Sequence, residues 1–208
     1  MILNVAKNLI RIISVYKFSL ITIIFFDLIY LIRGYKGNRL NFSNNDSMTD
    51  NFPCPYYFLF KIKKTLKNTN FRNFIDLGCG SGRTIDFYNK NFSNKNFVGI
   101  EYFTNQYEYC KKIFHNQKNI EIVQADFTKL NFSKYNPDCY FITDPFKKKM
   151  EFIEFIEKLI NFSLKKNFFF IFVNCNKKAI EELKNIQCIE SFYINKIQGY
   201  SIYKMNNN

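Results

Sequence analysis

Histidine is almost missing from this sequence, in which His115 is the one histidine among 208 residues. Six cysteines are present, but no two of them form a C-x-x-C pair. Zinc sites need several cysteine and histidine ligands at short spacings, so we expect no metal. Without a regular framework spacing, the cysteines are expected to be small buried thiols of a reducing, cytoplasmic compartment. His115 falls late in an expected helix and is expected to lie at the surface.

Two common phosphate-binding loops are also missing. No G-x-x-x-x-G-K-[ST] string occurs, which excludes a P-loop. The dinucleotide fingerprint G-x-G-x-x-G fails as well, because the third glycine counted from Gly78 and Gly80 would fall on Arg83. A nucleotide-dependent oxidoreductase is therefore disfavoured, and no internal repeat points to a repeat architecture.

Acidic residues are few. Seventeen Asp and Glu stand against 30 Lys and Arg, which makes a formal net charge of +13. This charge favours nucleic acid, phosphorylated ligands or an anionic membrane surface as a partner. The lysines are scattered, however, in a chain rich in Asn, Lys, Ile and Phe, so nucleic acid is possible but not favoured. Hydrophobic residues make up 47%, which indicates a packed domain with a sizeable core.

Residues 1–34 form an apolar and amphipathic helical segment. From Phe18 to Ile32 the only charge is Asp27, but a spanning helix needs about 20 apolar residues. No small-x-small cleavage site follows, so a secretory signal fits poorly. Three alternatives stay open: a helix docked on the domain, an in-plane membrane anchor, and a short spanning anchor. Upstream, a polar stripe recurs at helical spacing at Asn4, Lys7, Arg11 and Ser14.

Residues 35–55 are expected to be a polar linker, and residues 56–208 the main domain. There, apolar strand-length runs alternate with amphipathic helices, one of which is expected to have Thr104 as its N-cap. This order predicts an α/β, doubly wound, mostly parallel sheet that ends in an antiparallel hairpin. Helices are expected at 56–66, 83–91, 104–116, 150–164 and 177–185, and strands at 71–78, 96–101, 119–126, 138–144, 167–174, 189–195 and 199–205.

The string "DLGCGSG" follows the first expected strand, where ligands bind in such sheets. Three alternating glycines allow positive φ and let a ligand approach the backbone. The string resembles motif I, D-x-G-x-G-x-G, of the class I (Rossmann-like) S-adenosylmethionine-dependent methyltransferases. The resemblance covers about residues 56–205 and implies their seven-stranded fold with S-adenosylmethionine as the cofactor.

Further positions match that family in order. Glu101, 25 residues after Asp76, ends the second expected strand, and an acid there binds both ribose hydroxyls in the family. "QADF" ends the third strand, where an acid accepts from the adenine amino group and its neighbours flank the ring. The resemblance therefore implies a cofactor-binding set made of Asp76, Gly78, Cys79, Gly80, Gly82, Glu101, Tyr102, Asp126, Phe127 and Asp144.

The fourth expected strand ends in "TDPF", which resembles the [DNS]-P-P-[YF] motif of amine methyltransferases with one proline missing. The resemblance implies that Asp144 orients an acceptor amine and that Phe146 lines its path, where an aromatic ring suits a methylammonium product. The layout is also similar to small bacterial methyltransferase-domain proteins with an N-P-F or D-P-F motif, and more distantly to non-SET protein-lysine methyltransferases.

Each of these residues also has a structural alternative. Asp76 could cap a helix, Glu101 could be a solvated strand end, and Asp126 could be an N-cap. Cys79 is expected to be a small filler rather than a nucleophile, and the fourth-strand motif could be a turn without a catalytic role.

The sequence thus predicts a cytoplasmic methyltransferase, with possible membrane contact through residues 1–34. The expected acceptor is an amine of a protein lysine or a small molecule. The alternatives are a nucleic-acid methyltransferase and a non-catalytic S-adenosylmethionine-binding or assembly module.

Overall fold

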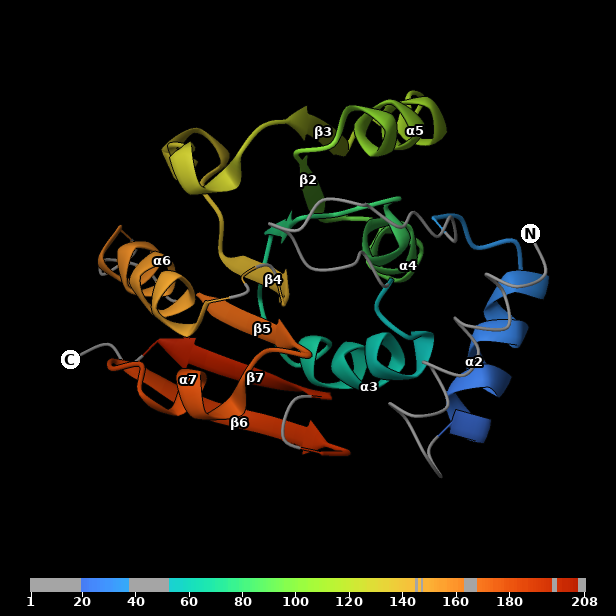
Figure 1. The fold of residues 1–208 in the computed structure, drawn as a ribbon. Helices are drawn as coiled ribbons and strands as arrows, with labels where there is room; N and C mark the ends of the chain where they lie inside the picture. Colours follow the sequence, from blue (N-terminus) through green and yellow to red (C-terminus); the bar gives the residue numbers. More distant parts are fainter. Residues whose placement is uncertain are drawn as a thin grey trace.

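The computed structural model describes residues 20–37, 53–144, 146, 148–162, 168–195 and 198–205. These residues form one seven-stranded sheet in the order β3-β2-β1-β4-β5-β7-β6, with helices on both faces (Figure 1). The sheet is parallel from β3 to β5, while β7 runs antiparallel to both β5 and β6. The fold class expected from the sequence is therefore confirmed. The strands are β1 (Asn73–Leu77), β2 (Asn96–Glu101), β3 (Ile120–Gln124), β4 (Cys139–Thr143), β5 (Phe169–Val173), β6 (Ile186–Tyr193) and β7 (Gly199–Met205).

The two faces of the sheet hold separate cores because successive strand residues point to opposite sides. On β1, Phe74 packs into the core under α2, α3, α4 and α5, whereas Ile75 packs into the core under α6 and α7. The central strands are buried on both faces, as their continuous apolar runs predict. The helices are α2 (Leu20–Ile32), α3 (Tyr56–Leu66), α4 (Arg83–Asn91), α5 (Thr104–Phe114), α6 (Lys149–Phe162) and α7 (Lys177–Glu181), and two 3₁₀ turns, η2 (Phe127–Lys129) and η3 (Phe132–Tyr135), lie between β3 and β4.

One local prediction is wrong. The N-cap of α5 is Phe103, and no side chain caps that end of the helix. Thr104 is the first helical residue, and its hydroxyl accepts a hydrogen bond from Gln124 Nε2 at 2.8 Å. The competing contact with β3 explains why the hydroxyl does not cap its own helix.

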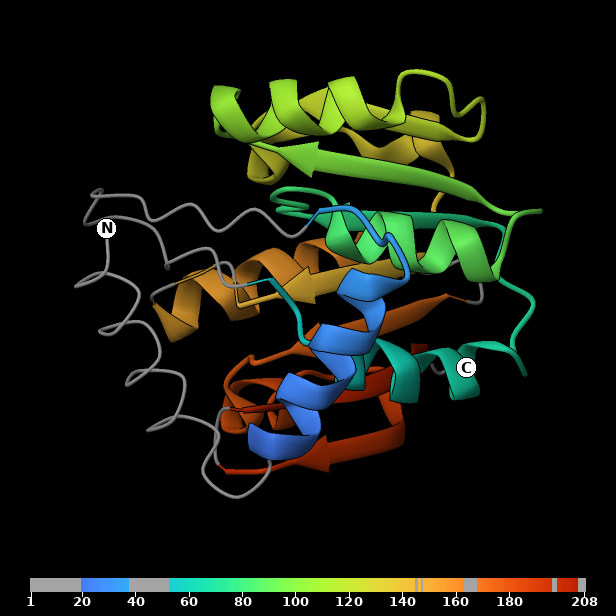
Figure 2. The same ribbon diagram turned by 90° about the vertical axis from the view of Figure 1, so that its right-hand side faces the viewer.

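The amino-terminal region is described only from residue 20, so the polar stripe at Asn4 to Ser14 lies outside the described residues, as do positions 38–52 of the expected linker. Within the described residues, no helix is long and apolar enough to cross a membrane. Helix α2 crosses the outside of the molecule beside α3 (Figure 2). Ile23 and Tyr30 of α2 are buried in the core that it shares with α3 and α4.

Candidate functional site

The candidate site lies where β1 and β4 are neighbours. The chain continues from β1 to β2 on one side and from β4 to β5 on the other side. The first four strands place β1 between β2 and β4, and Leu77 pairs with Ile142. The order reverses at this point, and in sheets of this kind ligands bind between the loops at the carboxyl ends of such neighbouring strands. The glycine loop, residues 78–82, leaves β1 here, and Asp144 follows β4 at the same edge.

The three alternating glycines serve different purposes. Gly82 has a φ of +83°, and a Cβ on it would lie 2.6 Å from the Phe114 ring and 2.9 Å from Cys110 Sγ. Helix α5 therefore approaches the loop too closely for any side chain at this position. Gly78 has a φ of +79°, but a Cβ there would meet nothing within 4 Å. Its open side is the part of the loop that a ligand can approach.

Glu101 ties the end of β2 to the glycine loop. Its Oε2 accepts from Gly80 N–H at 2.8 Å and its Oε1 from Phe103 N–H at 2.8 Å. The side chain is 4% exposed, which excludes the solvated strand end as an alternative. Burial raises the pKa of Glu101, against the opposing effect of these backbone donors. Because each carboxylate oxygen has two lone pairs, both oxygens keep capacity for one more donor.

Asp76 is the second buried carboxyl group of the site. It is the fourth of the five residues of β1, so it caps no helix, and it is 2% exposed. Burial, and secondarily the nearby Glu101 charge, raise the pKa of Asp76 to about 8, while a hydrogen bond from Thr84 acts in the opposite direction. Its Oδ2 is buried and has no hydrogen-bond partner among the described residues. Two buried acids thus lie close to the glycine loop: Glu101 is held by backbone donors, whereas one oxygen of Asp76 has none among the described residues.

Asp126 and Phe127 follow β3, as expected. Asp126 is the N-cap of η2, and its Oδ1 accepts from Thr128 N–H at 3.0 Å and from the Thr128 hydroxyl at 2.6 Å. This hydrogen bond from the Thr128 hydroxyl is the main reason that the pKa of Asp126 lies below its usual value. The structural alternative for Asp126, an N-cap, is therefore what the structure shows.

Phe146 brings the two motifs after β3 and β4 together. Its ring centroid lies 5.8 Å from that of Phe127 in an edge-to-face contact, and 5.4 Å from that of Phe155 on α6. Residues distant in the sequence, 127 and 146, thus form one aromatic wall beside the site.

Asp144 occupies an unusual backbone position at the end of β4. Its φ is +32°, a region that non-glycine residues rarely adopt and that is concentrated at functional sites. Its N–H donates to Val173 O on β5 at 3.2 Å. Partial burial raises the pKa of Asp144 to about 6. The neighbouring Pro145 lies outside the described residues.

The remaining predicted positions behave differently from one another. Cys79 is buried, and its pKa is raised mainly by a hydrogen bond with Cys110 and by burial. The thiol therefore stays protonated and fills space in the loop rather than acting as a nucleophile. Tyr102 is half-exposed, and its ring contacts that of Phe103. His115 is exposed, and its Nδ1 lies 2.8 Å from Lys112 O. The surface position expected for His115 is confirmed.

Sequence reasoning missed the way the amino-terminal region holds the glycine loop. Arg83 Nη1, 7% exposed as a residue, donates to Asp27 Oδ2 of α2 at 2.9 Å. The Ser81 hydroxyl donates to Gly37 O at 2.6 Å, and Lys36 N–H donates to Asp86 Oδ2 at 2.7 Å. The one visible signal was Asp27 itself, an acid inside an apolar stretch that would be costly to bury without a partner.

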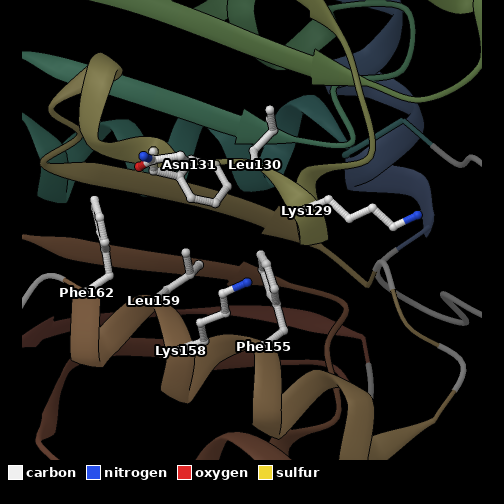
Figure 3. Close-up of a pocket in the computed structure, with 8 residues that line it drawn as sticks. Lys129, Leu130, Asn131, Phe155, Lys158, Leu159 and Phe162 are labelled. Carbon is white, nitrogen blue, oxygen red and sulfur yellow. The ribbon is translucent and has the colours of Figure 1, made fainter.

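A pocket of about 330 Å³ lies away from the glycine loop, between α6 and the 3₁₀ turns. Figure 3 shows Phe155, Lys158 and Phe162 rising from α6 towards residues 129–132, while Lys129 extends away from the pocket. The pocket contains none of the predicted site residues. In the part of the chain that the structure describes, no three His, Cys, Asp or Glu side chains gather in a way that could hold a metal ion.

Comparison with known proteins bears on this site. Residues 74–160, from β1 into α6, match a family described as "Methyltransferase domain". No curated protein matches the chain in sequence.

Solved structures resemble the fold. One, from Staphylococcus aureus and assigned as a caffeoyl-CoA O-methyltransferase, is 14% identical, with 96% of this chain and 98% of that chain covered and a TM-score of 0.59. The N-methyltransferase NodS from Bradyrhizobium japonicum, in complex with S-adenosyl-L-homocysteine, is 10% identical, with 72% and 85% covered and a TM-score of 0.57. A SAM-dependent methyltransferase from Aquifex aeolicus is 13% identical, with 74% and 100% covered and a TM-score of 0.53. At these identities the likeness establishes the fold.

Proposed function

We propose that this chain, whose residues 74–160 match a methyltransferase-domain family and whose fold is that of the class I methyltransferases, transfers a methyl group from S-adenosylmethionine to an amine. The observation that carries the proposal is the pair of buried carboxyl groups, Asp76 and Glu101, beneath a glycine loop with one open side. The acceptor amine would belong to a protein lysine or to a small molecule.

The charge of the site favours this cofactor over a dinucleotide. Burial disfavours the ionised forms of both acids, and a bound cation would favour those forms again. A diphosphate would instead add negative charge beside Asp76 and Glu101 and disfavour their ionisation further. S-adenosylmethionine carries a sulfonium and an ammonium group, whereas a dinucleotide carries two phosphate charges. The unpartnered Oδ2 of Asp76 and the open side of Gly78 also fit a group that brings donors to the loop.

Each residue then has a proposed task. Glu101 accepts from the ribose hydroxyls with its remaining lone pairs. Asp76 releases its proton when the cationic cofactor binds, because a nearby positive charge favours the carboxylate, and it then balances that charge. Asp126 would accept from the adenine amino group, Phe127 would flank the ring, and Tyr102 would belong to the same cofactor-binding set. Gly78, Cys79, Gly80 and Gly82 shape the loop, and Gly78 leaves space beside the backbone, whereas a side chain at Gly82 would meet α5.

When bound, the cofactor supplies an electrophilic methyl group on sulfur. The protein's part is to align the acceptor with the bond that breaks, to exclude water and to manage the proton of the acceptor. Asp144 accepts a hydrogen bond from the acceptor nitrogen and orients its lone pair. Phe146, packed on Phe127, closes one wall of the approach and keeps water away.

Binding is tested first, by calorimetry with S-adenosylmethionine, its demethylated product and NAD. Glu101→Gln should weaken binding of the first two by roughly 1–3 kcal/mol, because a charged acceptor for the ribose is lost. Glu121→Gln, an exposed acid on β3, is the matched control and should leave the affinity unchanged. Tight binding of NAD with none of S-adenosylmethionine would refute the proposed cofactor.

Catalysis is tested with methyl-labelled S-adenosylmethionine and a cell extract, whose labelled products are separated into protein, nucleic acid and small molecules. Label in lysine side chains or in a small amine supports the proposal. Label in nucleic acid would refute the amine of a protein or small molecule as the acceptor and would indicate a nucleic-acid methyltransferase. Cofactor binding without any methyl transfer would indicate a non-catalytic module. Asp144→Ala should lower the rate by roughly 10²-fold or more while cofactor affinity changes little.

We also propose that the enzyme works in the cytoplasm. All six cysteines are free thiols, and five of them are buried, which suits a reducing compartment. Fractionation of cells that produce the full-length chain tests this location.

A further inference from the structure

Helix α2 has two unlike faces. Ile23, Asp27 and Tyr30 recur at helical spacing and face the domain, where Ile23 and Tyr30 are 4% and 6% exposed. The other face carries large apolar side chains that are exposed, with Ile21 and Ile32 each at 78%. No charged residue lies on this outer face. Its exposed residues are Ile21, Ile24, Phe25, Leu28, Leu31 and Ile32.

The inner face is fixed to the domain, so the outer face has a defined position. Asp27 accepts from Arg83 Nη1 and from Tyr56 N–H, both at 2.9 Å. Tyr30 stacks on Tyr56 with ring centroids 4.8 Å apart. The helix runs across the outside of the molecule, and none of the described helices and strands covers its outer side (Figure 2).

A cluster of cations lies on and near α3, the helix that packs beside α2. Lys63 and Lys64 of α3 lie 5.1 and 4.9 Å from the centroid of Phe60, whose ring contacts Phe26 of α2. Burial lowers the pKa of Lys63, and the nearby positive charges of Lys67, Lys64 and Arg33 lower it further. Among the described residues, none of these four cations forms a salt bridge.

We propose that the outer face of α2, together with this cation cluster, docks the enzyme on an anionic lipid bilayer, with the helix lying in the plane of the interface. An exposed apolar stripe on one helix, with lysine and arginine on the neighbouring segments, suits an anionic lipid surface. The apolar side chains would enter the acyl boundary and the cations would meet the lipid headgroups. Exposed apolar patches of this kind mark interaction sites on soluble domains.

The charge pattern selects lipid over a second copy of this chain. Two copies that met through α2 would bring their cation clusters together, in a protein whose net charge is already +13. A spanning arrangement is also disfavoured. The described part of α2, Leu20–Ile32, extends about 20 Å, against a hydrocarbon core of about 30 Å. Pulling α2 into the bilayer would in addition leave the buried Arg83 without its carboxylate partner.

The test is sedimentation of the purified full-length chain with vesicles of phosphatidylcholine alone or mixed with phosphatidylglycerol. We expect binding to the mixed vesicles, weaker binding to the neutral ones, and release by alkaline carbonate. Phe25→Gln with Leu28→Gln should lower the bound fraction by about ten-fold or more, since the apolar contact is lost. Lys64→Gln with Lys67→Gln should weaken binding to the anionic vesicles only.

The matched control is Met150→Gln with Phe162→Gln, which removes two exposed apolar side chains from α6 and should leave vesicle binding unchanged. All variants should melt at the wild-type temperature, because the replaced side chains are exposed. Equal binding by the α2 double variant would overturn the proposal, as would no binding to anionic vesicles. Resistance to carbonate would assign the face to a spanning arrangement, and a dimer abolished by the α2 variant would assign it to a second copy. The test requires no methyl transfer, so its failure is independent of the proposed reaction.

Discussion

Asp76 offers the sharpest test of the electrostatics of the site. In the folded chain its carboxyl group is 2% exposed and its pKa is raised to about 8, mainly by burial and then by Glu101, from 3.8. Asp76→Asn replaces the protonated acid by a group of nearly the same shape that cannot ionise. It keeps an acceptor for the Thr84 hydrogen bond.

The sign follows from proton binding. Between about pH 4 and about pH 8 the folded chain holds a proton on Asp76 that the unfolded chain has released, so the free energy of unfolding falls as pH rises. The contribution is complete below about pH 4 and is lost as pH reaches about 8. The slope is about 1.4 kcal/mol per pH unit, so about 4 kcal/mol is lost between pH 4 and pH 7. Asp76→Asn removes this slope and should be the more stable protein at pH 7.

Urea unfolding at several pH values between about 5 and 8 measures the effect. The wild type should lose stability with rising pH, and the Asn variant should lose about 1.4 kcal/mol less per unit. Asp126→Asn is the control with opposite sign: the pKa of Asp126 is lowered, so its contribution disappears only on acidification and leaves this pH range unchanged. Asp76→Asn should also bind S-adenosylmethionine more weakly, so this variant would gain stability and lose function. Equal slopes for wild type and Asp76→Asn would refute the reasoning.

The remaining predictions concern the loop, the amino-terminal contact and the acceptor. Gly82→Ala should lower the free energy of unfolding by about 2–4 kcal/mol, because strain at positive φ adds to a clash with α5. Gly34→Ala, at a φ of +71° but with nothing within 4 Å, should cost only about 1–2 kcal/mol, and equal costs in urea unfolding would contradict the close approach. Asp27→Asn should lower the free energy of unfolding by about 1–3 kcal/mol and weaken cofactor binding, because Arg83 stays buried without a carboxylate partner. Calorimetry with and without the cofactor measures both effects, and an unaffected variant would show that this ion pair is dispensable. Burial raises the pKa of Asp144 to about 6, so the rate of methyl transfer should increase as the pH rises through about 6. If Asp144→Asn keeps this increase in its pH–rate profile, the increase comes from another group.

Much of the main domain follows from local pattern. The helices at 56–66 and 83–91 and the strands at 96–101 and 199–205 have the boundaries expected from their apolar periodicity. The reason is that burial on one face or on both is encoded within a few neighbouring residues. Thr104 shows the limit of this reasoning: its sequence context suits an N-cap, but β3 supplies a competing partner from 20 residues away.

The site divides in the same way. The spacing of the glycines and the acid after the second strand already indicated a ligand loop, because those features are local. The sequence could not show that the Asp126 carboxylate accepts hydrogen bonds from Thr128. It also could not show that Gly82 is required by a neighbouring helix rather than by a ligand. Both depend on the relative placement of segments that the chain pattern leaves open.

The amino-terminal region makes the division clearest. The sequence alone determined that residues 18–32 are apolar around a single acid, and so left docked, in-plane and spanning helices as alternatives. Only the tertiary structure decided that Asp27 turns inward to Arg83, 56 residues away, and that the apolar side chains turn out. Periodicity is a property of neighbours along the chain, whereas a buried charge finds its partner only where the fold brings one within reach.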